Sequence, residues 1–270
     1  IAHISGGATT EGAFDEAIRH SMTKMSHLHF TSAEEYRKRV IQLGEAPERV
    51  FNCGELSIDV IMHAPLVSRA ALEKKLGISF KKKNLVITYH PVTLEPGSAG
   101  RQFGSLLKAL DKLEDTMLIF TKPNADNEGR TIIKMIDDYA AKNSNKAAAF
   151  VSLGQERYLS LLKHVDAVIG NSSSGITEAP SFKIGTVNIG DRQKGRLRTP
   201  SIIDCEATEP GISAALRKLY SKEFQAGLKK VKSPYGDGRT SEKILKVLKE
   251  AKLAGIIKKK FYDIRLPDNI

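Results

Sequence analysis

Residues 166–178 read DAVIGNSSSGITE, and this stretch decides the fold that the sequence predicts. The apolar run at 166–169 indicates a buried strand, and the small and hydroxyl residues after it lead into a short helical turn at 179–182. Such a junction presents free backbone N–H groups and the positive end of a helix dipole. It therefore predicts an anion pocket, with Glu178 one turn further on as an acceptor for sugar hydroxyls. By itself the pattern fits an ordinary structural turn equally well, because strand–Gly/Ser–helix junctions are common in α/β proteins.

Strands and helices alternate on both sides of this stretch, which predicts parallel sheets in an α/β fold. In the N-terminal part, the expected strands and helices are residues 1–4, 15–25, 28–30, 32–43 and 50–52. Ser32, with Glu35 three residues later, indicates an N-cap and a capping box. Because residues 1–4 already look like the inside of a strand, we expect this first unit to be only the latter half of a domain.

A longer α/β series follows a helical stretch at 57–76 that Pro65 interrupts. Its expected strands are residues 85–89, 117–120, 148–151, 167–169, 186–189 and 201–203. Its expected helices are residues 104–113, 131–142, 156–163, 212–220 and 241–252. We therefore expect a first domain at 1–56, a second domain at 57–254, and a tail at 255–270 that either docks or frays.

The charge balance bears on the kind of partner. The 270 residues include 42 Lys and Arg against 31 Asp and Glu, which gives a formal net charge of +11. The lysines are dispersed over helix faces, as at 229–232, without interleaved aromatic residues or a nucleic-acid motif. A solvated basic surface accounts for this pattern better than nucleic-acid binding does. A smaller polyanion, such as a nucleotide diphosphate, also suits the charge.

Several other classes of protein are not indicated. The hydrophobic content of 41% is normal for a globular protein, and no apolar run approaches the length of a membrane span. The opening residues lack the basic and apolar regions of a signal peptide, so we expect a cytoplasmic protein without membrane partners. Cys53 and Cys205 lie far apart without metal-ligand spacing and are interpreted as buried thiols.

The loops that follow the expected strands of the second domain carry polar and cationic residues. They are HPVT at 90–93, KPNAD at 122–126, NSSSG at 171–175 and GDRQKGR at 190–196. In an open parallel sheet, ligands bind beyond the carboxyl ends of the strands. Hydroxyls and backbone N–H groups suit phosphate oxygens, Glu178 suits a ribose diol, and Arg192 supplies positive charge. The four loops together predict a site for a nucleotide with a pyrophosphate.

Each of these residues also has a purely structural interpretation. His90, before a proline, fits a histidine whose hydrogen bonds are satisfied within the fold. Asn124 fits a turn residue after Pro123. Arg192 fits a solvated run of charge that extends to Arg198. The coincidence of all four loops at one sheet edge favours the binding site.

The first segment holds a second constellation, GGATTEGAFDEAIRH at residues 6–20. A glycine loop precedes a helix with Asp15 and Glu16 in its first turn, and Arg19 lies one turn on, on the same face as Asp15. Helix starts also favour acidic residues because of the dipole, so spacing alone leaves a structural role open.

Taken together, these residues resemble the hydrolysing UDP-N-acetylglucosamine 2-epimerases of sialic acid and related nonulosonic acid biosynthesis. The family includes epimerases that act on diacetamido-trideoxy sugars in legionaminic acid pathways. The matching segments follow the family's order along nearly the whole chain, at residues 6–7, 10–16, 18–20, 90–93, 123–126, 170–175 with 178–179, 187–190 with 192–196, and 235–238. The resemblance implies the B-type glycosyltransferase fold, in which two Rossmann-like domains hold the substrate in the cleft between them.

The resemblance also implies roles for individual residues. The UDP moiety would be held by His90, Asn124, Ser172, Ser173, Gly175, Glu178 and Arg192. Asp15 would be a catalytic carboxylate, with Arg19 beside it. The implied reaction removes the proton at C2 of the sugar, eliminates UDP to leave a glycal, and adds water to give the free manno-configured sugar. Such chemistry needs acids and bases with tuned pKa values and cationic groups on the departing diphosphate, but no metal or redox cofactor.

The chain departs from the family pattern in its glycine loop. Members typically carry a glutamate either two residues after the histidine or directly after the glycines, where this chain has Ser5 and Ala8. Glu11 is the candidate substitute. A non-hydrolysing epimerase, a related glycosyltransferase and a catalytically impaired nucleotide-sugar-binding protein therefore remain alternatives. The implied partner is a UDP-sugar substrate, and relatives of this fold often pair, so we expect a homo-oligomer, either a dimer or a tetramer.

Overall fold

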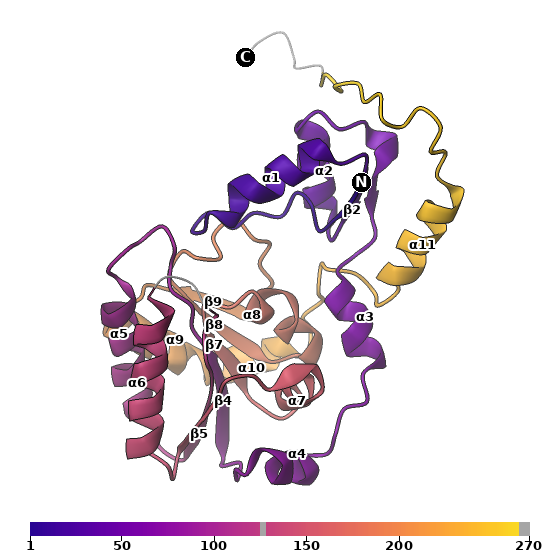
Figure 1. Ribbon diagram of the computed structural model, residues 1–270. Coiled ribbons are helices and arrows are strands. Elements are labelled where there is room, and N and C mark those ends of the chain that lie inside the picture. The colour runs from indigo at the N-terminus through magenta and orange to yellow at the C-terminus, as the bar shows by residue number, and fades with distance from the viewer. Residues whose placement is uncertain (125–127, 265–270) are drawn as a thin grey trace. The chain divides into compact units, whose positions relative to one another are not determined.

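The computed structural model describes residues 1–124 and 128–264, and the chain divides into two units (Figure 1). The first unit contains Ile1–Thr10, Phe14–His63 and the chain from Pro234 on. The second contains Glu11–Ala13 and Ala64–Ser233. Ala125 and Asp126 of the expected 122–126 loop lie outside the described residues, as does the end of the tail after residue 264.

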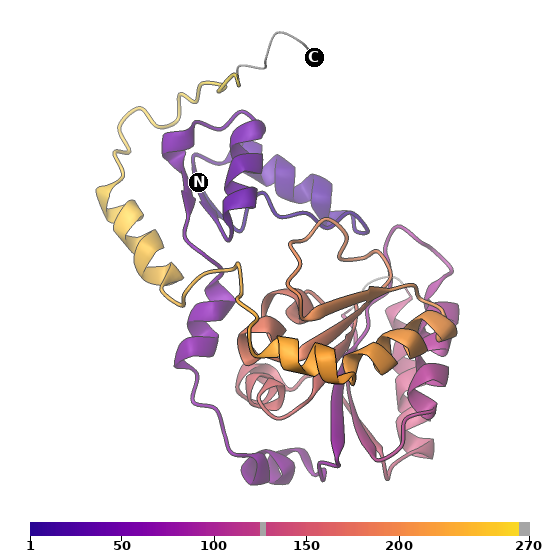
Figure 2. The same ribbon diagram turned by 180° about the vertical axis from the view of Figure 1, so that it is seen from behind.

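The first unit is built on a three-stranded parallel sheet in the order β1 (Ala2–Ile4), β2 (Leu28–Thr31), β3 (Val50–Asn52). Its helical elements are α1 (Asp15–Met25), α2 (Glu34–Gln42), η1 (Pro47–Arg49), α3 (Leu56–His63) and α11 (Thr240–Glu250). Ile244 of α11, drawn in yellow in Figures 1 and 2, packs into a small core with Leu28, Phe30 and Cys53. The predicted alternation of strands and helices is confirmed in this unit.

Two expectations for this unit differ from the structure. The N-cap of α2 is Ala33 rather than Ser32, and no side chain caps the helix. The chain from residue 234 on, which was assigned to the second domain and a tail, belongs to the first unit. The described part of the tail is docked, because the backbone N–H of Tyr262 donates to the carbonyl oxygen of Gly44 at 2.9 Å.

The second unit is an open sheet of six strands in the order β6-β5-β4-β7-β8-β9, and every neighbouring pair is parallel. The strands are β4 (Lys83–Thr88), β5 (Thr116–Thr121), β6 (Ala147–Phe150), β7 (Ala167–Gly170), β8 (Gly185–Ile189) and β9 (Ile202–Cys205). The chain winds outward from β4 to β6, then returns to β7 and winds the other way. The strand order therefore reverses between β4 and β7, which is where Rossmann-like sheets bind ligands.

Helices cover both faces of this sheet (Figure 1). The helical elements are α4 (Arg69–Leu76), α5 (Ala99–Asp111), α6 (Gly129–Lys142), α7 (Gly154–Leu162), α8 (Ser174–Thr177), η2 (Ala179–Phe182), α9 (Glu209–Leu219) and α10 (Lys222–Leu228). Side chains of α5, α6 and α9 pack with the sheet into the main hydrophobic core. Figure 2 shows α9 and α10, in orange, one after the other alongside the strands. The predicted α/β fold with a parallel sheet is confirmed.

Gly170, the last residue of β7, explains how β4 and β7 approach each other at their carboxyl ends. Its φ is +134°, and a Cβ atom placed on it would lie 2.0 Å from the carbonyl oxygen of Thr88. A side chain cannot occupy that space, so the sequence needs glycine here. The close approach brings the loops after these two strands together at the point where the strand order reverses.

Candidate functional site

All four expected loops of the second unit leave the carboxyl edge of the same sheet. His90 follows β4, Asn124 follows β5, the serine-rich segment follows β7, and Arg192 follows β8. Parallel neighbours place their carboxyl ends at one edge, so the arrangement follows from the strand order. We refer to these loops, residues 90–93, 122–124, 171–178 and 190–196, as the rim.

Asn171 organises the rim. Its side chain is fully buried, its Oδ1 accepts from the backbone N–H of His90 at 2.7 Å, and its Nδ2 donates to the carbonyl oxygen of His90 at 2.8 Å. The side-chain amide thus imitates one more step of the β4–β7 ladder, beyond the last strand pair of Thr88 and Gly170. This pair of hydrogen bonds fixes the backbone that carries the His90 imidazole.

The carbonyl oxygen of Asn171 fixes the opposite loop. It accepts from Arg192 Nη1 and from Gln193 Nε2, each at 3.1 Å. The His90 ring in turn lies 2.9 Å from Asn124 Oδ1, measured at its Nδ1. One residue therefore connects an imidazole, an amide and a guanidinium, all groups that can donate hydrogen bonds to phosphate oxygens.

The serine-rich segment leads into α8, a helix of only four residues. Ser173 is its N-cap without a side-chain cap bond, and the N–H of Ser174 points to Ser172 Oγ at 3.3 Å. Gly175 packs on the sheet, where a Cβ atom would lie 2.7 Å from Thr186 Cγ2. The small residues let the turn lie low over β7 and β8, with half-buried Ser172 and Ser173 hydroxyls at its start.

Glu178 directly follows α8, and a hydrogen bond from Ser174 holds its carboxylate. Its Oε2 accepts from Ser174 Oγ at 2.6 Å, and the Ser174 Oγ lies 2.5 Å from the hydroxyl of Tyr158 on α7. Burial raises the pKa of Tyr158 above its usual value, as does the nearby Glu178 charge. The expected ribose acceptor is thus part of a chain of hydrogen bonds.

A hollow borders the rim on the side of β9. It has a volume of about 500 Å³, and its lining includes Gly190, Asp191 and Lys194 of the loop after β8 together with Cys205. Burial raises the pKa of the Cys205 thiol to about 12, and Asp204 and Glu206 act in the same direction. The thiol is therefore protonated at neutral pH and is no nucleophile there.

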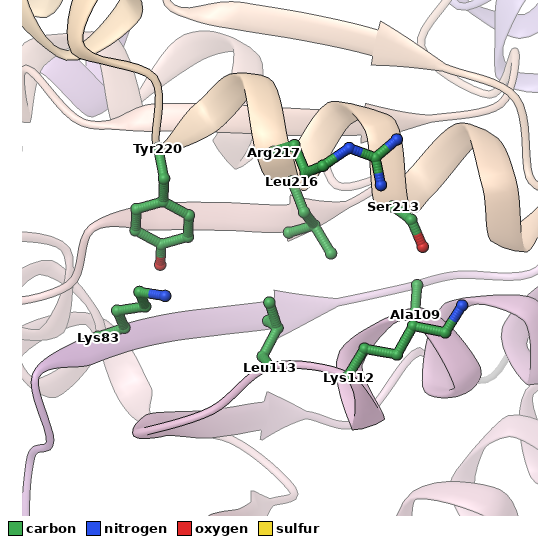
Figure 3. A pocket seen from close by; sticks show the side chains of 8 residues that line it. All are labelled: Lys83, Ala109, Lys112, Leu113, Ser213, Leu216, Arg217 and Tyr220. Carbon is green, nitrogen blue, oxygen red and sulfur yellow. The ribbon is translucent and has the colours of Figure 1, made fainter.

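A different cavity, of about 350 Å³, lies at the amino edge of the sheet (Figure 3). Its lining residues come from β4, α5, α9 and the turns after these helices, and they are Lys83, Ala109, Lys112, Leu113, Ser213, Leu216, Arg217 and Tyr220. Lys112 forms an ion pair with Glu209 at 2.5 Å, and the Lys83 ammonium lies 4.9 Å from the centroid of the Tyr220 ring. Lys112 and Arg217 lie at the C-terminal ends of α5 and α9, where cations neutralise the helix dipole, so a structural role accounts for them. The rim is the better candidate site.

In the first unit, the expected catalytic residue Arg19 contacts Glu16, the residue that follows Asp15. Glu16 Oε2 accepts from the backbone N–H of Thr10 at 2.6 Å and from Arg19 Nη1 at 3.3 Å, and its Oε1 lies 3.0 Å from His20 Nε2. Arg19 also donates to the carbonyl oxygen of Ala8 at 3.1 Å. Asp15 is exposed at the first position of α1.

Glu11 lies in the second unit and contacts the loop after β8. Its N–H donates to the carbonyl oxygen of Lys194 at 3.1 Å, and its carboxylate lies 3.8 Å from the Lys194 ammonium. The next residue, Gly12, has no room for a side chain, since a Cβ atom would lie 2.6 Å from Arg192 Cα. The Glu11 carboxylate is exposed beside the rim.

Neither Ser5 nor Ala8 supplies a carboxylate to the glycine loop. Ala8 is buried, with 4% of its surface exposed. Ser5 has a positive φ of 63°, and its hydroxyl donates to Glu55 Oε2 at 3.4 Å. Two carboxylates thus lie close to this loop, Glu16 at Thr10 and Glu55 at Ser5.

Sequence reasoning missed four residues that the structure brings into these clusters: Asn171, Gln193, Tyr158 and Glu16. Asn171 and Gln193 lie inside the matched segments, so the sequence indicated that they lie near the site. It did not indicate which groups they bind. Tyr158 lies on a helix that carried no motif.

Across residues 1–124 and 128–264, no group of three or more His, Cys, Asp or Glu side chains is placed to hold a metal ion. No helix in that part of the chain has both the length and the apolar character needed to cross a membrane.

Comparisons with known proteins point to one family. Residues 1–249 match the family model described as UDP-N-acetylglucosamine 2-epimerase. The chain is 48% identical over 265 residues to a GDP/UDP-N,N'-diacetylbacillosamine 2-epimerase (hydrolyzing) of Campylobacter jejuni, covering 98% of the chain and 68% of the relative. It is 40% identical over 266 residues to the polysialic acid biosynthesis protein P7 of Escherichia coli, covering 98% and 67%. The chain therefore spans about two thirds of the length of these relatives.

A third curated relative and a solved structure agree with this result. A UDP-N,N'-diacetylbacillosamine 2-epimerase (hydrolyzing) of Legionella pneumophila is 34% identical, with 92% of the chain and 64% of the relative covered. The crystal structure of UDP-GlcNAc 2-epimerase from Neisseria meningitidis bound to UDP-GlcNAc matches with a TM-score of 0.79 at 16% identity. It covers 93% of this chain and 70% of that one, and at this identity it shows the fold.

Proposed function

The chain belongs to the UDP-N-acetylglucosamine 2-epimerase family, and from this we propose that it forms most of a hydrolysing 2-epimerase. The reaction converts a nucleoside-diphosphate-linked 2-acetamido sugar to the free manno-configured sugar and the nucleoside diphosphate. The observation that carries the proposal is the 48% identity over 98% of the chain to a relative named as hydrolysing. The rim, with donors from four loops at one sheet edge, is the structural feature that supports it.

The rim would hold the nucleotide. His90, Arg192, Ser172 and Ser173 offer donors for the diphosphate, and Glu178 offers acceptors for the ribose diol. When the C2 proton has been removed and UDP departs, negative charge grows on the leaving phosphate. Donors that are already fixed stabilise that charge without reorganisation, and Asn171 fixes both His90 and Arg192.

The sugar chemistry would fall to carboxylates near the glycine loop. Asp15 remains the candidate proposed from the family pattern, Glu11 lies beside the rim loop, and Glu16 is added because Arg19, His20 and the Thr10 N–H converge on it. Arg19 would hold the Glu16 carboxylate in place through its hydrogen bond.

We propose a diacetamido-trideoxy sugar as the preferred substrate, ahead of N-acetylglucosamine. Two of the relatives with at least 34% identity carry names that specify N,N'-diacetylbacillosamine. One of those names includes GDP as well as UDP, so the experiment below also compares the two nucleobases, guanine and uracil.

The test is product analysis with the full-length protein. We would incubate it with the UDP- and GDP-linked diacetamido sugars and with UDP-N-acetylglucosamine, and identify the products by NMR. A free manno-configured monosaccharide together with UDP or GDP is the expected result. A product that is still linked to the nucleotide would overturn hydrolysis and favour a non-hydrolysing epimerase.

A second candidate function, nucleotide-sugar binding with impaired catalysis, is favoured by Ala8. The family pattern places a glutamate at position 5 or 8, and neither Ser5 nor Ala8 carries a carboxylate. Ala8→Glu in the full-length protein discriminates the two. A large gain in turnover means that the natural chain is an impaired enzyme, whereas unchanged high turnover means that Glu16 or Glu11 already performs the task.

A further inference from the structure

In the second unit, two hydroxyl groups and the carboxylate of Glu178 form a continuous chain of hydrogen bonds. Tyr158 lies on α7, Ser174 is the first residue of α8, and Glu178 directly follows α8. The Tyr158 hydroxyl and Ser174 Oγ are 2.5 Å apart, and Ser174 Oγ lies 2.6 Å from Glu178 Oε2. Two hydrogen bonds thus join a tyrosine to the carboxylate.

The carboxylate of Glu178 determines which group donates in each of the two hydrogen bonds. An ionised carboxylate only accepts, so the Ser174 hydroxyl donates its single proton to Glu178. Ser174 Oγ can then only accept from Tyr158, and the tyrosine is the donor. Burial raises the pKa of Tyr158, which keeps this proton in place across the physiological pH range.

The consequence for Glu178 is a fixed carboxylate. A glutamate side chain has several rotatable bonds, and ordering it against a ligand costs free energy. Here one oxygen is already held, and donors that themselves receive hydrogen bonds polarise one another. A carboxylate has about four lone-pair sites, so a hydrogen bond from one serine hydroxyl does not by itself prevent it from accepting hydrogen bonds from a ligand's hydroxyls.

We propose that Tyr158 and Ser174 are positioning residues that fix Glu178 for the 2′- and 3′-hydroxyls of the nucleotide, and so set the preference for ribonucleotides. This inference rests on the proposed nucleotide site. It assigns the preference for ribose to the Tyr158–Ser174–Glu178 chain, and it gives α7 a functional role.

The test measures binding of two ligands by calorimetry: UDP, and 2′,3′-dideoxy-UDP, which lacks both hydroxyls. Tyr158→Phe removes only the hydroxyl at the start of the chain. We expect it to weaken UDP binding about fivefold, the effect of one lost hydrogen bond of about 1 kcal/mol, and to change dideoxy-UDP binding less than twofold. Ser174→Ala, which removes the direct bond to the carboxylate, should weaken UDP binding more, again with little effect on dideoxy-UDP.

Tyr139→Phe is the matched control. Tyr139, on α6, is a buried tyrosine whose hydroxyl donates to a carboxylate, that of Asp111, at 2.8 Å. The variant makes the same chemical change away from the rim and should bind both ligands as the wild type does.

The outcomes separate this proposal from the one on which it rests. If Tyr158→Phe and Ser174→Ala weaken both ligands equally, the chain is merely structural and the proposal is overturned. If the wild-type protein binds UDP and dideoxy-UDP with equal affinity, Glu178 does not hold the diol, and this proposal fails while the nucleotide site stands. If the wild type binds neither, the nucleotide site itself fails.

Discussion

A single buried amide, Asn171, links two loops that the sequence separates widely. Its side chain bonds both backbone groups of His90, and its carbonyl oxygen accepts from Arg192 and Gln193. Because both side-chain contacts are to the backbone of His90, any residue of similar shape without an amide would leave polar groups unpaired. The cost of such buried unpaired groups is what makes this position critical.

The variant Asn171→Ala tests the role of this side chain directly. The variant should lose about 2 kcal/mol of stability, because the N–H and carbonyl of His90 lose their partners, and should bind UDP at least about tenfold more weakly. Calorimetric titration and thermal unfolding measure the two effects separately.

The same unit contains a matched control in Asn84→Ala. Asn84 is buried at the amino end of β4, and its side chain makes the same two-way pair with the backbone of Lys81, at 2.9 and 3.0 Å. It should lose similar stability and keep the affinity for UDP. Equal losses of affinity in both variants would contradict a specific role for Asn171.

The sequence predicted which residues reach the rim, but not how they are held. His90, Asn124, Glu178 and Arg192 could be placed because each follows a strand, and parallel strands share an edge. The partner of Asn171 is a backbone group 81 residues away, which no local spacing reveals. Helix spacing likewise indicated that Asp15 and Arg19 share a face, but it did not indicate that the glycine loop folds back and brings the Thr10 N–H to Glu16.

Among the elements, the junction of β4 and β7 depends on one glycine. A Cβ on Gly170 would overlap the carbonyl oxygen of Thr88, and its φ of +134° lies where other residues are strained. We expect Gly170→Ala to destabilise the protein by at least about 3 kcal/mol, through the clash and the strain together. Thermal unfolding measures the loss.

Gly227→Ala is the control for a glycine that has no such constraint. Gly227 lies in α10, and a Cβ there would meet no atom within 4 Å. This variant should be neutral or more stable by up to about 1 kcal/mol, because alanine is the better helix former. A Gly170→Ala protein as stable as Gly227→Ala would contradict the close approach of β4 and β7.

The first unit is predicted to lose stability in mild acid because of a buried cluster around Glu45. The carboxylate, with 2% of its surface exposed, pairs with Lys24 and Lys259 at 2.7 Å and with His29 at 2.9 Å. Burial lowers the pKa of fully buried His29 from 6.5 to about 4, which outweighs the raising effect of Glu45. The folded state therefore keeps His29 neutral while the unfolded state takes up a proton below about pH 6.5.

Stability should consequently fall as the pH drops from about 6.5 towards 4, by about 2 kcal/mol between pH 7 and pH 5. The pKa of Glu45 is also lowered, and that contribution is lost only below about pH 4.5. Unfolding temperatures at pH 7 and pH 5 measure the effect. His29→Gln should remove most of it, whereas exposed His63→Gln should not; equal pH dependence in all three proteins would refute this account.

For the molecule as a whole, the order of the strands was predictable and the division into units was not. The alternation of apolar runs indicated every strand, because period and length are local properties. The return of the chain from Pro234 to the first unit depends on contacts such as that of Lys259 with Glu45, more than 200 residues apart in sequence. Residues that pack at such separations leave no periodic signal.

The central claim is that a nucleoside diphosphate binds on the rim of the second unit. Amide hydrogen exchange of the full-length protein, with and without saturating UDP, tests it most directly. The account predicts slower exchange in peptides that contain residues 90–93, 171–178 and 190–196, and unchanged exchange around the cavity of Lys83, Ser213 and Tyr220 at the opposite edge. Protection at that cavity with an unaffected rim would contradict it.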